Sequence, residues 1–74
     1  MARALHVLKG DHTAQATAVI AAQRMAGDEV TVALIGAAEV PTLPEGVTIH
    51  RVPDDVSWER LLELIFEAES AVTW

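Results

Sequence analysis

The sequence predicts a small α/β domain in which a mostly parallel four-stranded sheet, in the strand order 3-2-1-4, carries one main helix on each face. Short runs of apolar and β-branched residues alternate with helix-type segments, and Gly or Pro ends most of the runs. The connection between the first two runs is long enough for a parallel crossover. With 74 residues the chain has no room for a second core, so residues 1–74 are expected to form one domain.

The first expected elements are a strand and a helix. Residues 4–9 are too few for a stable helix and are mostly apolar, as in a strand covered on both faces. Gly10 ends this run, and an Ala-rich segment without Gly or Pro predicts a helix over 12–26. We expect Asp11 or Thr13 to cap the beginning of that helix.

The middle of the chain predicts two more strands. Gly27 is placed to end the helix, and the β-branched run at 29–35 follows as a strand, parallel to the first through a right-handed crossover. Residues 37–46 contain two prolines and predict a linker rather than a helix. Residues 47–52 alternate as a third strand. The linker is slightly short for a parallel crossover, so the direction of this strand stays open.

The last third predicts a helix over about 58–68, capped by Ser57, and a short final strand at 70–74. Three glutamates repeat every four residues of this helix and predict a solvated ridge. The side chains expected to form its main apolar stripe are Trp58, Leu61, Leu62 and Ile65. More of its circumference is apolar than contact with one sheet requires.

Composition excludes several classes of function. The net charge is −6 with only five Lys or Arg, too few for a phosphate-binding groove, so direct nucleic-acid binding is not expected. No apolar run has the length of a membrane span, and no leader-like segment opens the chain, so we expect a cytoplasmic protein. Burial of apolar surface is expected to contribute about 105 kcal/mol to folding, whereas the loss of conformational entropy costs about 110 kcal/mol. Because the two nearly cancel, the monomer is expected to be marginally stable, and this predicts an oligomer.

The expected strand order creates a crevice at the carboxyl ends of the first and last strands, where folds of this kind bind ligands. Lys9, Gly10, Asp11 and His12 are expected there, beside Trp74. Free N–H groups at a helix start and a nearby Lys could hold an anion or small ligand, although a plain capped turn explains the same residues.

Other chemistry has little support in the sequence. The chain has three His, one adjacent acidic pair at Asp54 and Asp55, and no Cys, and none of the spacings suits a metal. His6 is expected to be a hydrogen-bonded core residue. No nucleophile or acid–base constellation is present, so we expect no catalytic residues, no cofactor and no enzymatic activity.

One helix per face leaves part of the sheet uncovered, and this predicts a subunit interface. The candidate interface residues are Trp58, Leu64, Phe66 and Trp74. Trp74 is included because a terminal side chain is expected to find few neighbours in its own chain. Two alternatives stay open: the linker 37–46 covers the exposed sheet, or Trp58 belongs to the core.

The sequence resembles the DsrE/DsrF/DsrH-like family, and most closely its short DsrH/TusB branch. The resemblance rests on Leu-His-Val-Leu-Lys at 5–9, the strand ending in Gly at 29–36, Gly-Val-Thr-Ile-His at 46–50, and the helix, short strand and Trp of 58–74. It covers most of the chain and implies a flavodoxin-like α/β/α subunit.

The same resemblance implies a subunit that assembles with itself or with Cys-bearing DsrE/DsrF-like subunits. Such assemblies relay persulfide sulfur towards thiolation of the tRNA wobble uridine or towards sulfur oxidation. Two features depart from the family pattern: the chain has no Cys to carry a persulfide, and the linker 37–46 replaces a helical segment. The resemblance therefore implies a non-catalytic, structural subunit.

Overall fold

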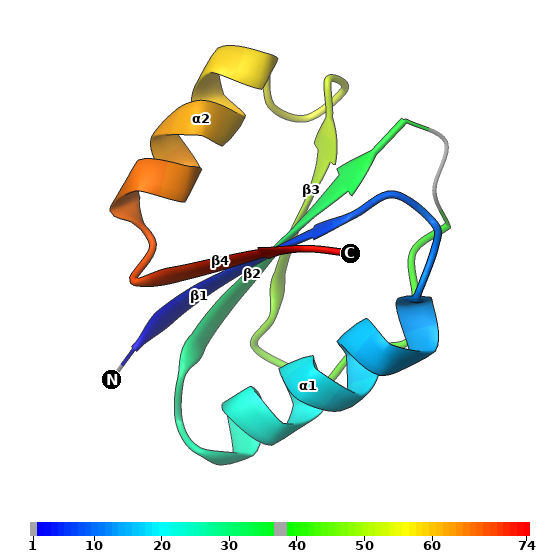
Figure 1. The fold of residues 1–74 in the computed structure, drawn as a ribbon, viewed down its shortest axis with the longest axis vertical. Coiled ribbons are helices and arrows are strands. Elements are labelled where there is room, and N and C mark those ends of the chain that lie inside the picture. Colours follow the sequence, from blue (N-terminus) through cyan, green and yellow to red (C-terminus); the bar gives the residue numbers. More distant parts are fainter. Residues whose placement is uncertain (1, 37–38) are drawn as a thin grey trace.

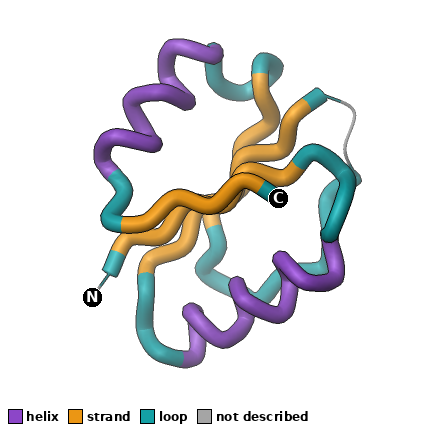
Figure 2. The backbone as a smooth tube through the Cα atoms, viewed as in Figure 1, coloured by secondary structure: helices purple, strands orange, loops and turns teal. Residues whose placement is uncertain are grey.

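The computed structural model describes residues 2–36 and 39–74 and consists of a parallel sheet between two helices (Figure 1). The elements follow the chain in the order β1 (Arg3–Leu8), α1 (Thr13–Met25), β2 (Glu29–Ile35), β3 (Thr48–Val52), α2 (Trp58–Glu67) and β4 (Ser70–Thr73). Figure 2 shows α1 and α2 on opposite faces of the strands. The predicted α/β class, with four strands and a main helix on each face, is confirmed, and it is consistent with a small flavodoxin-like fold.

The four strands lie in the order β3-β2-β1-β4 and all pair in parallel. The predicted order 3-2-1-4 is therefore confirmed. The open question of the direction of β3 is decided by its register, in which Thr31 to Ile35 of β2 pair with Thr48 to Val52 in the same direction. The order reverses between β1 and β4, which makes their carboxyl ends the topological switch point of the sheet.

The core on the α1 side is the larger of the two. Side chains alternate between the faces of a strand, so every second residue of β1 and β2 points towards α1. Ala16 and Ile20 of α1 are fully buried against them. The buried members of this cluster are Ala4, Leu8, Ala16, Ile20, Val30, Val32 and Leu34. The small side chain of Ala16 lets the helix approach the sheet closely.

The core on the α2 side has fewer residues. Its buried members are Leu5, Val7, Ala33, Val52 and Leu61, with Ile35, Val56, Leu64 and Ala68 partly buried around them. Leu61, Leu64 and Ala68 are spaced by three and four residues and form the side of α2 that meets the sheet. The predicted stripe was therefore right for Leu61 and wrong for Trp58, Leu62 and Ile65, which are exposed.

The helix ends differ in how well local sequence predicts them. Ser57 caps α2 as predicted, because its hydroxyl accepts a hydrogen bond from the Arg60 N–H at 3.1 Å. The residue at the start of α1 is instead His12, in the left-handed conformation with φ of 55° and without a side-chain cap. The expectation that Asp11 or Thr13 caps α1 is wrong.

The linker between β2 and β3 runs along the α1 side of the sheet, although its residues 37 and 38 lie outside the described part. Leu43 and Val47 pack against the α1-side core. The Arg24 guanidinium of α1 donates to the Glu45 carbonyl at 3.3 Å and holds the linker beside the helix. The linker thus covers apolar surface next to α1, as one alternative expected, and leaves the outer surface of α2 uncovered.

Candidate functional site

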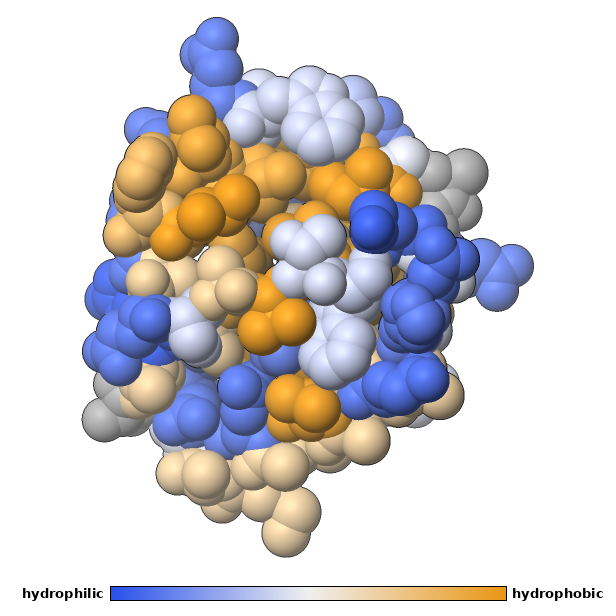
Figure 3. Space-filling view, viewed as in Figure 1, coloured by the Kyte–Doolittle hydropathy of each residue, from blue (hydrophilic) through white to orange (hydrophobic). Residues whose placement is uncertain are grey.

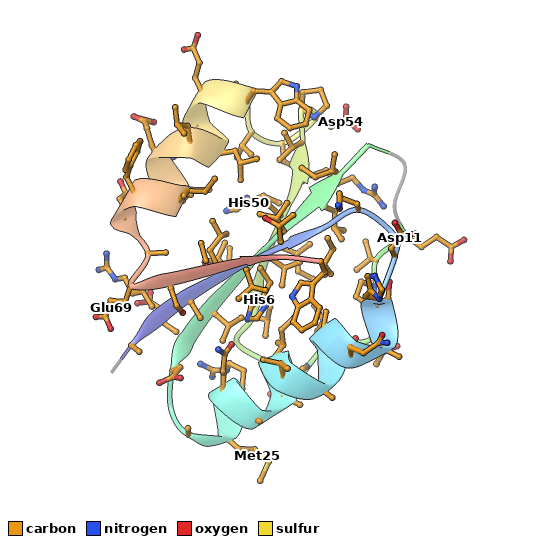
Figure 4. The ribbon with its side chains drawn as sticks, in the orientation of Figure 1. His6, Asp11, Met25, His50, Asp54 and Glu69 are labelled. Atoms are coloured by element: carbon orange, nitrogen blue, oxygen red, sulfur yellow. The ribbon has the colours of Figure 1, made fainter. Side chains whose placement is uncertain are left out.

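The structure brings Lys9, Gly10, Asp11 and His12 together on one exposed loop between β1 and α1. The loop leaves the carboxyl end of β1, beside the end of β4, as the predicted crevice requires. Within residues 2–36 and 39–74, the side chains of Lys9, Asp11 and His12 have no hydrogen bond or ion pair, and Asp11 points away from the protein (Figure 4). These groups share a loop but are not organised around a common point.

A polar network on the α1 side of the sheet joins β1, α1 and the end of the chain. The imidazole of His6 is fully buried, and its Nδ1 accepts a hydrogen bond from the Trp74 indole N–H at 2.9 Å. That donor leaves the ring proton on Nε2, which donates to Gln23 Oε1 at 2.7 Å. Both imidazole nitrogens are therefore satisfied, and the prediction of a hydrogen-bonded core histidine is confirmed.

Trp74 is half-buried by this network. Its ring stacks on His6 with centroids 6.0 Å apart and planes 18° apart, and it packs against the α1-side core. Its backbone N–H donates to the Val7 carbonyl at 2.9 Å. The expectation that Trp74 lacks neighbours within its own chain is wrong, because the parallel pairing of β4 with β1 carries it over His6.

The two ends of the sheet offer no metal site in the described ranges, 2–36 and 39–74: no group of three or more metal-ligating side chains gathers there. His6 lies inside the fold, whereas His50 and Asp54 belong to β3 and the turn after it (Figure 4). Asp55 accepts a hydrogen bond from the Arg51 backbone N–H at 2.8 Å and so stabilises that turn.

A cavity of about 240 Å³ lies at the amino ends of the strands, under the last turn of α2. Arg3 and Glu29 stand at its mouth as an ion pair at 3.3 Å with both side chains exposed. Its remaining walls come from Ala4, Leu5, Thr31, Leu64, Glu67 and Ala68. The cavity lies at the end of the sheet opposite the Lys9–His12 loop, so the predicted ligand residues do not contribute to it.

The most distinctive surface of the molecule is one side of α2. Four side chains spaced by three and four residues lie on it, largely in solvent: Trp58 is 56% exposed, Leu62 54%, Ile65 37% and Phe66 80%. We call these four residues the apolar flank of α2. Large exposed apolar patches on a small protein mark places where another surface binds.

The structure divides the predicted interface residues between surface and core. Trp58 and Phe66 belong to the apolar flank, whereas Leu64 is half-buried against the α2-side core and Trp74 packs on His6. The alternative that Trp58 is a core residue is wrong. The sequence analysis did not include Leu62 and Ile65 among the interface residues. The acidic ridge of α2, formed by Glu59, Glu63 and Glu67, could have indicated them, because a helix with one acidic side and one buried side has a third side, and here that side is apolar.

Among the described residues, no helix is both long enough and apolar enough to cross a membrane. Comparison with models of known protein families, with curated proteins and with solved structures finds no match for this chain.

Proposed function

We propose that this protein is a non-catalytic structural subunit of an oligomeric assembly of the sulfur-relay type. The observation that carries the proposal is the apolar flank of α2, because a chain of this size gains little from exposing Trp58, Leu62, Ile65 and Phe66 unless another surface covers them. Covering them adds buried apolar area to a core that is thin on the α2 side.

The relay part of the proposal comes from the resemblance of the sequence to DsrH/TusB-type subunits. The chain has no Cys, so it cannot hold a persulfide, and the sulfur must travel on a Cys-bearing subunit of the same assembly. Its own contribution is then to hold that assembly together, in thiolation of the tRNA wobble uridine or in sulfur oxidation.

The proposal is tested by deleting the gene in its native host and measuring thiolated wobble uridine in tRNA and sulfur oxidation. We expect one of the two to fall and to recover with the wild-type chain. Recovery should fail with Leu62→Glu, which alters the apolar flank, and should succeed with Met25→Glu, which alters a still more exposed apolar side chain on the opposite layer.

A labelled-sulfur experiment tests the division of labour. The chain, tagged and purified from its host, should bring with it a protein that carries labelled persulfide on Cys, while the chain itself stays unlabelled. Copurification without any sulfur carrier, together with unchanged thiolation and oxidation in the deletion strain, would refute the proposed function.

A further inference from the structure

The outer edge of β4 is an unprotected strand edge. All four of its residues, Ser70 to Thr73, are exposed, and none is charged or Pro. Natural sheets usually guard an open edge with Lys, Pro, a bulge or a covering segment, since an open edge pairs readily with another strand. The opposite edge strand, β3, has such protection, because it contains His50 and Arg51 and is followed by Pro53.

The apolar flank of α2 faces the same way as this open edge. Glu59, Glu63 and Glu67 repeat every four residues along one side of α2, and Glu67 lines the cavity together with residues of β1 and β2, among them Leu5 and Thr31. That side of the helix therefore lies over β1 and β2, on the side away from β4. Because the apolar flank is on the other side of the buried stripe, it lies towards β4 and beyond the edge of the sheet.

A residue of α1 extends the same surface below the sheet. Val19 lies one turn before Gln23, which hydrogen-bonds His6 on the β1 side of the helix, whereas Arg24 on the other side reaches the linker. Val19 therefore faces the β4 side. Val72 of β4, paired with His6, lies between the two helices at the edge itself.

Six exposed apolar side chains thus share one side of the molecule. We call them the β4-facing surface: Val19, Trp58, Leu62, Ile65, Phe66 and Val72. Figure 1 shows β4 passing in front of the other strands, and Figure 3, in the same orientation, shows apolar side chains gathered over α2 and across β4. Met25 lies at the far end of α1 (Figure 4), away from this surface.

The charge of this surface favours a second copy of the chain over a basic partner. The chain carries a net charge of −6, yet none of the six residues is charged. Of the acidic ridge that borders this surface on α2, Glu63 and Glu67 are each paired with Arg60 at 3.4 Å. Glu69 lies at the amino end of β4, at the margin of this surface (Figure 4). Two copies can therefore meet here without bringing their acidic residues face to face.

We propose that two copies of the chain pair through β4, antiparallel about a two-fold axis, to form one continuous eight-stranded sheet. A two-fold axis that passes between the edge strands perpendicular to the sheet makes them antiparallel and closes the assembly as a dimer. This inference rests on the proposed role as a subunit of an oligomer and names the partner as the chain itself. It places α2 and its copy side by side on one face of the sheet.

The size of the side chains fits this arrangement. Successive strands are about 4.8 Å apart, so β1 and its copy are about 14 Å apart in the joined sheet. Since α2 packs over β1, the two helices are farther apart than the about 8–10 Å of helices in direct contact. Long side chains such as Trp58 and Phe66 fill the difference.

The area is also sufficient. With about 200 Å² for a fully exposed large side chain, the β4-facing surface offers about 600 Å² of apolar area per copy. A standard interface buries about 800 Å² per partner. The main chain of β4 supplies most of the remainder, because strand pairing covers its outer edge.

The first test compares the mass of the protein in solution for two matched variants. Wild type is expected to be a dimer by light scattering, and Phe66→Glu is expected to raise the dimer dissociation constant at least about 100-fold, because a buried aromatic is lost twice in a symmetric interface. Met25→Glu, at a side chain 90% exposed, should change it less than about threefold. Circular dichroism checks that both variants are folded.

The second test locates the contact by single cysteines, which the Cys-free chain allows without background. In a two-fold antiparallel pair one residue of β4 faces its own copy across the axis. Among the single variants Ser70→Cys, Ala71→Cys, Val72→Cys and Thr73→Cys, that one should give rapid disulfide dimers, because opposed residues of antiparallel strands are about 4.5–5.5 Å apart and suit a disulfide. Thr48→Cys on the opposite edge strand, β3, should not.

A wild-type monomer, a dimer indifferent to Phe66→Glu, or cross-linking at Thr48→Cys in place of the β4 positions would each overturn the inference. The outcomes separate failure of the inference from failure of the proposed function. If the protein is a β4-linked dimer but deleting its gene leaves sulfur transfer unchanged, only the proposed function is refuted. If the protein is a monomer but deleting its gene lowers sulfur transfer, only the proposed dimer is refuted.

Discussion

Replacing Trp74 with Phe should destabilise the fold through His6. The substitution keeps an aromatic ring but removes the indole N–H that donates to His6 Nδ1 at 2.9 Å. The imidazole is fully buried, so the acceptor is left without a partner inside the protein. A buried polar group without a partner costs about 1–3 kcal/mol. We therefore expect the free energy of unfolding to fall by about 2 kcal/mol.

The assay is urea unfolding together with a thermal melt, at a protein concentration low enough to keep the chain monomeric. For a domain of this size about 2 kcal/mol corresponds to a loss of about 8–16 °C in Tm. Trp58→Phe is the matched control, because Trp58 is 56% exposed and its indole has no hydrogen bond in the described part of the chain. Its effect should stay within about 0.5 kcal/mol.

A double-mutant cycle separates the hydrogen bond from the loss of ring area. His6→Leu and Trp74→Phe together should show a coupling energy of about 1 kcal/mol or more, because the second substitution no longer strands a buried acceptor. A Trp74→Phe effect no larger than that of Trp58→Phe, with no coupling to His6, would show that the network does not stabilise the fold and would refute the reasoning.

Three further substitutions test other parts of the structure. Ser57→Ala should lower the free energy of unfolding by about 1 kcal/mol through loss of the α2 cap, and an equal loss in the exposed control Ser70→Ala would contradict this. Ile20→Ala should cost about 2–5 kcal/mol in urea unfolding, since Ile20 is fully buried, and a cost below about 1 kcal/mol would mean that α1 packs loosely. His12→Gly should raise Tm slightly, because a left-handed L-residue costs about 1–2 kcal/mol while Gly loses about 0.5–1 kcal/mol of backbone entropy; a lower Tm would show that the His12 side chain stabilises the loop.

The candidate site was only partly predictable from sequence. The buried role of His6 followed from its place in a short apolar strand, and the exposure of Lys9 to His12 followed from the break at Gly10. The partners of His6 did not follow, because Gln23 and Trp74 are distant in sequence and meet only when α1 and β4 pack on β1. A terminal Trp has no local pattern that reveals such a contact.

For α2, the sequence determined that a helix forms, where it begins, and that it has more apolar surface than one sheet contact needs. It could not determine which apolar side meets the sheet. Leu61 has helical spacing both with Leu62 and Ile65 of the predicted stripe and with Leu64 and Ala68 of the observed one. The structure shows that Leu61, Leu64 and Ala68 pack on the sheet, and it leaves Trp58, Leu62, Ile65 and Phe66 outside.

The sequence by itself determined the number and type of the elements, their order along the chain and the order of the strands, because these depend on local periodicity, turn residues and the right-handed crossover rule. Tertiary structure alone decided the direction of β3, the hydrogen-bonded burial of Trp74 and the side of α2 that faces solvent. The physical reason is that these features depend on contacts between segments far apart in sequence, whose geometry is fixed only when the sheet has assembled and both helices have packed on it.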